Sequence, residues 1–262
     1  MASFSRASVP TLTIDYSPGA PSPEQQVLNY LNDEANLPAV RECGALKIPI
    51  SKVFLQDAAA AVSRQYDCKD ELKFDPATFW GYQMREGSQQ EIICRKEGEV
   101  VGTNPLYDLM LAVANAAVQM FATGTRKLER RLSPVFWRYD PSNTGGKTDI
   151  GFDVHMDFSL IGVTYQCAPG LFWVPEDGTE VDLWSEDEPC IYLMYGAPSA
   201  ERGFTPFRHG VKRIAGQTRL AGGVFADIID DAGDDGVAEN MADYDAQAAK
   251  EVDAAGAAAA SS

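Results

Sequence analysis

The chain contains two histidines, His155 and His209, and both lie in its second half. In the segment FDVHMD, the two-residue period of a β-strand would place Asp153, His155 and Asp157 on one face. His209, on a distant segment, would complete a set of two histidines and one carboxylate. Such a set binds iron(II) and leaves adjacent coordination positions open for dioxygen and a co-substrate. We therefore predict His155, Asp157 and His209 as metal ligands and catalytic residues, with Asp153 as a less favoured substitute for Asp157.

The same residues also allow an ordinary structural interpretation. A single His-X-Asp sequence occurs in many strands that bind no metal. His155 and His209 could then be half-buried packing residues, and Asp157 could simply face solvent. The surrounding sequence has to decide between these two interpretations.

The residues before position 132 predict a mixed region of strands and helices. Apolar periodicity and turn residues indicate a strand, a helix, a second strand and a second helix, in that order. These four elements are expected at residues 9–17, at residues 22–31, at residues 45–50 and at residues 52–66.

The clearest helix follows Asn104 and Pro105, which suit the N-cap and the first helical position. Apolar residues then recur at steps of three and four over residues 106–121. We expect this helix to extend to Arg131, with Gly124 as a weak point. Its methionines and phenylalanine are typical of core packing, so we predict a scaffold helix without a chemical role.

After Leu132 the sequence consists of short aromatic or β-branched runs separated by glycine, proline and acidic turns. This pattern predicts a sandwich or barrel, and a double-sheet jelly roll best accommodates a buried metal site between its sheets. The predicted fold is therefore mainly β with flanking helices. A double-stranded β-helix core at 133–230 follows an α/β N-terminal region at 1–132 and precedes an acidic, alanine-rich tail at 231–262, which we expect to be disordered or weakly helical.

Composition limits the classes of function. The 262 residues are 45% hydrophobic and can bury a sizeable core. Of the net charge of −16, positions 227–262 carry ten acidic residues and one lysine, which leaves −7 on the other 226 residues. This balance argues against a nucleic-acid partner, and no apolar stretch predicts a signal peptide or a membrane span. We expect a cytoplasmic enzyme, and the sequence does not indicate its oligomeric state.

Residues around the proposed ligands resemble the iron(II) and 2-oxoglutarate dioxygenase superfamily, in its isopenicillin N synthase-like branch. FDVHMDFSLIGVTYQ (152–166) is similar to the branch's first ligand strand and the next one, GLFWV (170–174) to its GLQV strand, and GFTPFRHGVK (203–212) to its distal-histidine strand. The two histidines are 54 positions apart, as in the family pattern. Weaker similarity covers VPTLTID, Arg41 to Gly44 and Gly81-Tyr82.

The resemblance implies a co-substrate site as well as a metal site. Arg219, ten residues beyond His209, corresponds to the arginine of the family's RxS motif, which binds the far carboxylate of 2-oxoglutarate. Tyr139 corresponds to a tyrosine that assists this carboxylate. The chain departs from the motif at Ala221, where the family has a serine. The lost hydroxyl removes one hydrogen bond, worth about 1 kcal/mol.

We therefore predict an oxygenase that uses iron(II), 2-oxoglutarate and dioxygen on a small metabolite, as the resemblance implies, with a role in secondary metabolism. Hydroxylation, desaturation and oxidative cyclisation all begin with abstraction of a hydrogen from carbon, and the sequence does not choose among them. Two alternatives remain: an iron oxidase that needs no 2-oxoglutarate, like isopenicillin N synthase, and a non-catalytic jelly-roll or cupin-like binding protein. Five residues are weak candidates for the pocket wall, each equally consistent with packing or surface positions: Tyr82, Arg85, Tyr165, Tyr195 and Arg208.

Overall fold

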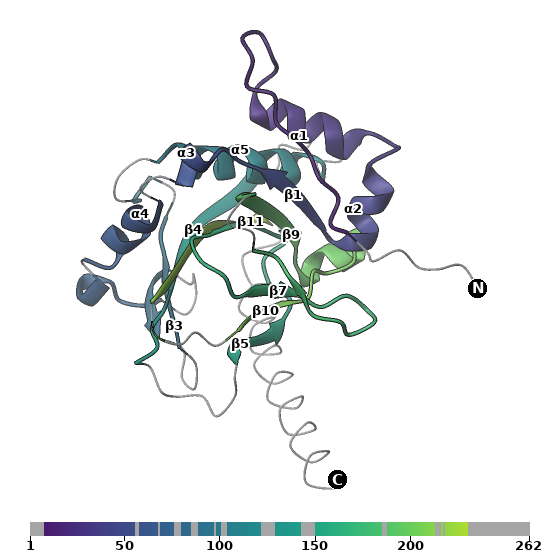
Figure 1. Ribbon diagram of the computed structural model, residues 1–262. Coiled ribbons are helices and arrows are strands. Elements are labelled where there is room, and N and C mark those ends of the chain that lie inside the picture. Colours follow the sequence, from purple (N-terminus) through teal and green to yellow (C-terminus); the bar gives the residue numbers. More distant parts are fainter. Residues whose placement is uncertain are drawn as a thin grey trace, which may run out of the picture.

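Two antiparallel β-sheets face each other in the computed structural model (Figure 1). The larger sheet has the order β1 (Ala45–Pro49), β9 (Cys190–Tyr195), β6 (Ile161–Gln166), β11 (Arg219–Ile229), β4 (Glu129–Tyr139), β3 (Gln90–Cys94) and β2 (Gly81–Met84). The smaller has the order β5 (Ile150–His155), β10 (His209–Lys212), β7 (Leu171–Trp173) and β8 (Val181–Asp182). The structure describes residues 8–55, 58–67, 69–75, 80–84, 89–96, 98–100, 104–121, 129–142, 150–184, 188–212, 216 and 218–229.

Much of the interior between the two sheets is filled by apolar side chains. One buried cluster of side chains from both sheets fills it, including Leu171, Trp173, Met194, Phe207 and Val211. The predicted mainly β fold with a jelly-roll core is thus confirmed. The predicted division at residue 132 remains a prediction, although β1, β2 and β3 pair into the same sheet as β4, β6, β9 and β11.

Helices cover the outer face of the larger sheet (Figure 1). They are α1 (Pro23–Asn32), α2 (Leu37–Cys43), α3 (Lys52–Leu55), α4 (Ala58–Gln65) and α5 (Pro105–Gln119), with 3-10 turns η1 (Lys69–Glu71) and η2 (Ala197–Arg202). Helix α5 contacts β11, β6 and α1. Its predicted start is confirmed, because the Asn104 side chain accepts a hydrogen bond from the Leu106 amide at 2.8 Å. Helix α1 is capped in the same way, because the Ser22 side chain accepts a hydrogen bond from the Gln25 amide.

Three predicted elements differ from the observed ones. Helix α5 ends at Gln119, and residues 129–131, which we expected in the helix, begin β4, where they pair with 227–229 of β11. Long-range strand pairing there outweighs local helical propensity. Residues 122–128 lie outside the described part. The strand expected at 9–17 is reduced to one bridge between Thr11 and Lys47, and Pro10 has no amide hydrogen to extend the pairing. The helix expected at 52–66 forms two pieces, α3 and α4, and residues 56–57 are not described.

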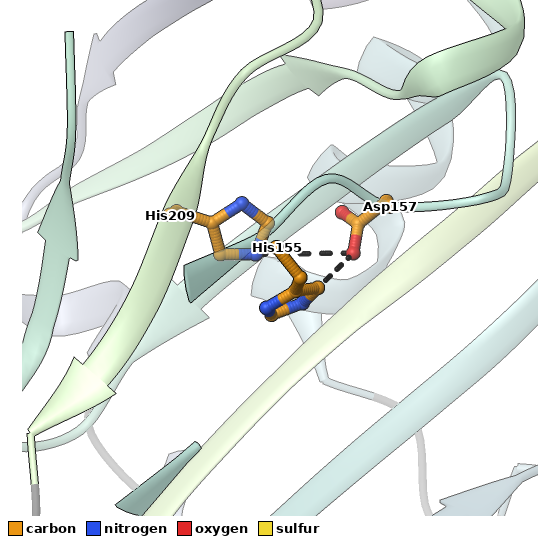
Figure 2. Close-up of side chains that lie close together, drawn as sticks. All are labelled: His155, Asp157 and His209. Carbon is orange, nitrogen blue, oxygen red and sulfur yellow. Dashed lines mark ion pairs between the residues drawn. The ribbon is translucent and has the colours of Figure 1, made fainter. Parts of the chain in front are cut away.

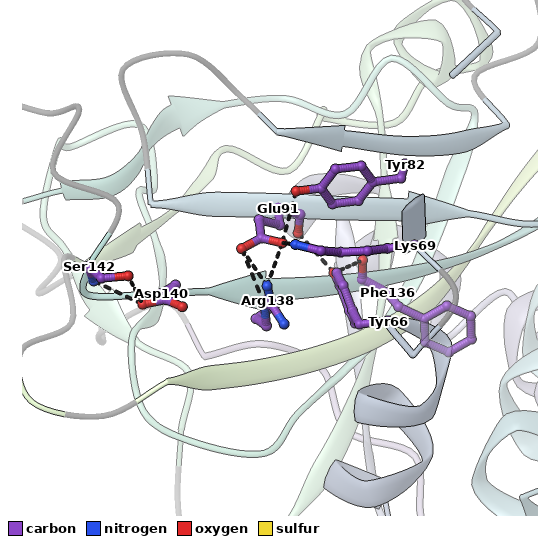
Figure 3. A network of polar contacts seen from close by, with 8 residues as sticks. All are labelled: Tyr66, Lys69, Tyr82, Glu91, Phe136, Arg138, Asp140 and Ser142. Atoms are coloured by element: carbon purple, nitrogen blue, oxygen red, sulfur yellow. Dashed lines mark hydrogen bonds and ion pairs between the residues drawn. The ribbon is translucent and has the colours of Figure 1, made fainter. Parts of the chain in front are cut away.

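A polar network fixes α4 and η1 to the outer face of the larger sheet (Figure 3). The Glu91 carboxylate accepts two hydrogen bonds of 2.7 Å from one nitrogen of Arg138, and it also contacts Lys69 and the Tyr82 hydroxyl. The Tyr66 hydroxyl donates to a backbone carbonyl of β4 at 2.8 Å. Glu91 lies on β3 and Arg138 on β4, so the network ties these two strands together. Their chain neighbours Gln90 and Tyr139 point to the opposite face of the sheet, where they line the cavity described below.

The acidic tail lies outside the described residues, so its predicted disorder remains a prediction. No helix in the described part of the chain is both long and apolar enough to cross a membrane.

Candidate metal and co-substrate site

His155, Asp157 and His209 converge between the two sheets (Figure 2). Asp157 Oδ1 lies 3.6 Å from His155 Nε2 and 3.8 Å from His209 Nε2. One ligand atom from each residue lies within 4.8 Å of the other two. Ligands at right angles on one metal with bonds of about 2.1 Å lie about 3 Å apart. The three side chains therefore fit a single octahedral metal ion after small side-chain movements.

Strand pairing brings the two histidines together. His155 ends β5 and His209 begins β10, and their Cα atoms are direct partners in the antiparallel register. The ring centroids are consequently 4.5 Å apart. The pairing of β5 with β10 thus brings together two histidines that are 54 positions apart in the sequence.

His209 has the surroundings of a neutral metal ligand. Burial lowers its pKa to about 4, so the ring is uncharged near neutral pH. Its Nδ1 lies 3.2 Å from the carbonyl oxygen of Phe207. In the neutral ring Nδ1 then carries the hydrogen and donates it to that carbonyl, which leaves the lone pair of Nε2 directed at Asp157 and the metal position.

Asp157 lies beyond the end of β5, not on the strand face that the period-two argument assumed. Two glycines make room for it. A Cβ at Gly162 of β6 would lie 3.0 Å from Asp157 Oδ2, and one at Gly196 would lie 2.5 Å from the Asp157 carbonyl oxygen. The side chain of Asp153 is outside the described part, so its role as a substitute remains untested.

A cavity extends from the triad along the inner face of the larger sheet. Its lining is mostly apolar near Asp157 and polar at the opposite end. The lining includes Ile92, Trp137, Phe158, Gly162 and Phe225, and further along Thr164, Gln166, Ala221, Gln90, Tyr139 and Arg219. A ligand that spans both ends would touch the metal with one end and polar side chains with the other.

Arg219 occupies the polar end and is 1% exposed. Its Nε donates to the carbonyl oxygen of Pro169 at 3.1 Å, and its Cζ lies 4.7 Å from the centre of the Tyr139 ring. Nη1 and Nη2 are buried and have no hydrogen-bond partner among the described residues. Burial lowers the pKa of this guanidinium, and the nearby Tyr139 phenol offsets part of that effect. A buried pair of cationic donors without an acceptor is the complement of a planar anion such as a carboxylate.

The register explains the positions of the other predicted co-substrate residues. Arg219 of β11 pairs with Tyr139 of β4, whose hydroxyl accepts a hydrogen bond of 2.8 Å from Gln90. Ala221 lies two residues further along β11, lines the cavity, and pairs with Gln166 of β6. Tyr139 and Ala221 therefore flank the arginine, and the role of Arg219 and Tyr139 in binding a co-substrate stays a prediction.

Four of the five candidates for the pocket wall, all within the described part of the chain, do not line this cavity. The Tyr82 hydroxyl contacts Glu91 in the outer network, and Tyr165 and Tyr195 belong to the buried core. Arg208 is exposed, and Arg85 lies outside the described residues. Residue selection from the sequence missed the actual walls, notably Trp137, Phe158, Phe225, Gln90 and Gln166. Alternation along the strands carried that signal for all of them except Phe158, since each of the other four lies an even number of residues from another cavity residue on its own strand. Phe158 lies between β5 and β6.

Comparison with known proteins supports the fold. No protein-family model matches the sequence, and no curated protein matches it. Solved structures do match. A full-length Neurospora crassa protein in complex with alpha-KG has a TM-score of 0.56 and 12% identity, over 84% of this chain and 85% of that one. JOX2 in complex with 2OG, Fe and JA gives 0.57 and 13%, over 85% and 75%. The 2-oxoglutarate complex of dioxygenase for auxin oxidation 1 from Arabidopsis thaliana gives 0.55 and 12%, over 86% and 94%.

The chain thus has the fold of proteins, dioxygenases among them, that have been crystallised with 2-oxoglutarate. The fold implied by the resemblance in the sequence is confirmed. The isopenicillin N synthase-like branch remains a prediction.

Proposed function

We propose that the protein is an iron(II)- and 2-oxoglutarate-dependent oxygenase acting on a small molecule. One observation carries the proposal: a cluster of two histidines and one aspartate shares a cavity with a buried arginine whose terminal nitrogens have no partner among the described residues. Either feature alone has ordinary explanations. Together they match a ligand that chelates a metal at one end and carries a carboxylate at the other.

The spacing of the two ends supports 2-oxoglutarate as that ligand. Asp157 Oδ2 lies next to Gly162 of β6, and Gly162 pairs with Phe225 of β11. Arg219 lies six residues from Phe225 on the same strand, which corresponds to roughly 20 Å. The arginine side chain, a five-carbon dicarboxylate and a metal ion bound by Asp157 can together span this distance.

In this proposal His155, Asp157 and His209 hold the iron, and Arg219 and Tyr139 hold the far carboxylate. Iron(II) with bound 2-oxoglutarate supplies the activation of dioxygen that permits attack on an unactivated C–H bond. The protein positions both groups and excludes water through its apolar walls.

An aromatic group beside Asp157 offers a surface for the substrate. It consists of Trp137, Phe158 and Phe225, and the Trp137 and Phe225 rings make an edge-to-face contact at 5.8 Å. These rings would pack against an apolar part of the substrate. A substrate from secondary metabolism, expected from the resemblance, remains part of the proposal.

The test uses the purified full chain loaded with iron(II) without oxygen. Addition of 2-oxoglutarate should produce a visible metal-to-ligand charge-transfer band, and admission of oxygen should convert 2-oxoglutarate to succinate. The matched control is His209→Ala, which should bind iron below stoichiometry and show no band.

Other outcomes distinguish the alternatives. Stoichiometric iron without a band or succinate would reject the 2-oxoglutarate requirement and leave an iron oxidase. Failure of the wild-type protein to bind iron near stoichiometry would reject the metal site and leave a jelly-roll binding protein.

A further inference from the structure

Gln166 lines the cavity that contains both the His155, Asp157 and His209 cluster and Arg219. It belongs to β6 and pairs directly with Ala221, the position where the arginine motif has lost its hydroxyl. Arg219 is the diagonal neighbour of Gln166 across these two strands, a separation that long side chains can bridge. Gln166 is only 5% exposed, and it lines the cavity.

In the Gln166 amide, the nitrogen has a hydrogen-bond partner and the oxygen has none among the described residues. Nε2 donates to the Thr164 hydroxyl oxygen at 3.0 Å, whereas Oε1 is buried without a hydrogen-bond partner among the described residues. A buried amide oxygen without a partner costs free energy, so this atom indicates a ligand or an alternative orientation. The two ends of an amide have nearly the same shape and exchange by a half-turn of the terminal bond.

Thr164 can accommodate either orientation. Its hydroxyl lies 3.3 Å from the Gly222 carbonyl oxygen and 3.4 Å from that of Tyr165, both long contacts. After a half-turn of the amide, the Thr164 hydroxyl would donate to Gln166 Oε1. Nε2 would then occupy the side that now carries the unpartnered oxygen, and an N–H group would face the cavity.

We propose that Gln166, oriented by Thr164, donates a hydrogen bond to the carboxylate held by Arg219 and replaces the hydroxyl absent at Ala221. The inference rests on the proposed function, because the carboxylate is that of 2-oxoglutarate. A neutral amide donor complements the guanidinium without adding charge to the cavity. It also explains how the chain tolerates alanine at 221: the donor comes from the adjacent strand.

The experiment measures equilibrium binding of 2-oxoglutarate to the iron(II) protein without oxygen, by calorimetry and by the charge-transfer band. Gln166→Met keeps the length of the side chain and removes the donor, and should weaken binding about tenfold or more, as expected for one hydrogen bond to a charged group. Gln166→Glu places a second carboxylate there and should weaken binding further. Adding Ala221→Ser to Gln166→Met should restore most of the affinity.

Two controls separate this role from a general loss of folding. Gln65→Met changes a glutamine of α4 that is also buried, at 1% exposure, but lies outside the cavity lining, and should leave binding unchanged. Gln166→Met should bind the same amount of iron as the wild type, and without 2-oxoglutarate it should be no less stable in thermal unfolding.

If Gln166→Met binds 2-oxoglutarate within about twofold of the wild type, the inference is wrong while the proposed function stands. If the wild-type iron protein itself does not bind 2-oxoglutarate, the proposed function fails and this inference fails with it.

Discussion

Replacing Arg219 by methionine should stabilise the protein in the absence of ligands and abolish its response to 2-oxoglutarate. The guanidinium is 1% exposed, and Nη1 and Nη2 have no hydrogen-bond partner among the described residues. Each unsatisfied buried donor group costs about 1–3 kcal/mol, against about 1 kcal/mol gained from the Nε bond to Pro169. Methionine keeps an apolar stem and removes these donors, but it also loses the contact of the guanidinium with the Tyr139 ring, worth about 1 kcal/mol. The two donor groups together cost about 2–6 kcal/mol, so the expected net gain is up to about 4 kcal/mol.

Thermal unfolding of the metal-loaded protein measures both effects. A gain of about 2 kcal/mol raises the melting temperature by roughly 4–8 °C for a chain of this size. Excess 2-oxoglutarate at about 100 times its Kd should stabilise the wild type by about 2.7 kcal/mol and should leave Arg219→Met unchanged. Arg219→Lys is the matched control: it keeps a buried charge but cannot form two parallel hydrogen bonds to a carboxylate. It should show neither the gain in stability nor full 2-oxoglutarate binding.

An Arg219→Met protein that is less stable than the wild type without ligand, and is still stabilised by 2-oxoglutarate to the wild-type extent, would refute this prediction. The guanidinium would then be part of the folded core and not an anion site.

Contacts around the site lead to three other predictions. Gly162→Ala should lower iron affinity about tenfold or more, because the new Cβ would press on Asp157 Oδ2 at 3.0 Å; equilibrium dialysis of metal checks this, and unchanged affinity would contradict it. Gly196→Ala should destabilise the whole protein, because its Cβ would lie 2.5 Å from the Asp157 carbonyl oxygen, part of the backbone; soluble yield and melting temperature measure this, and a wild-type melting temperature would show the prediction to be wrong. Glu91→Gln should cost about 2–3 kcal/mol in urea unfolding at about pH 7, since it breaks a buried pair with a partly exposed Arg138. Burial alone would raise the pKa of Glu91, but the Arg138 hydrogen bonds and charge lower it below 4.5. The wild-type advantage should therefore be complete above about pH 4.5 and disappear as the pH falls through the lowered pKa; an advantage that persists at about pH 2 would show that the ion pair is not its source.

The composition of the candidate metal site could be predicted because the chemistry of metal binding restricts the residue types so strongly. With two histidines in the chain, a metal face built from histidine and carboxylate had few possible members. The helix at Pro105–Gln119 could be predicted equally well, because its cap and its apolar period are both local features. Its C-terminal end could not, since residues 129–131 are fixed by pairing with β11, far away in sequence.

Sequence alone therefore determined which residues could do chemistry: two histidines, an aspartate two residues from one of them, and an arginine ten residues from the other. Tertiary structure decided how they meet. The pairing of His155 with His209 brings the two rings together. Asp157 lies beyond the end of β5 and joins them in the candidate metal site, next to Gly162. The pairing of Gln166 with Ala221 places an amide where the motif lacks a hydroxyl. Such partners depend on strand register, and register is set by long-range packing of both sheets, which no local pattern around a single residue records.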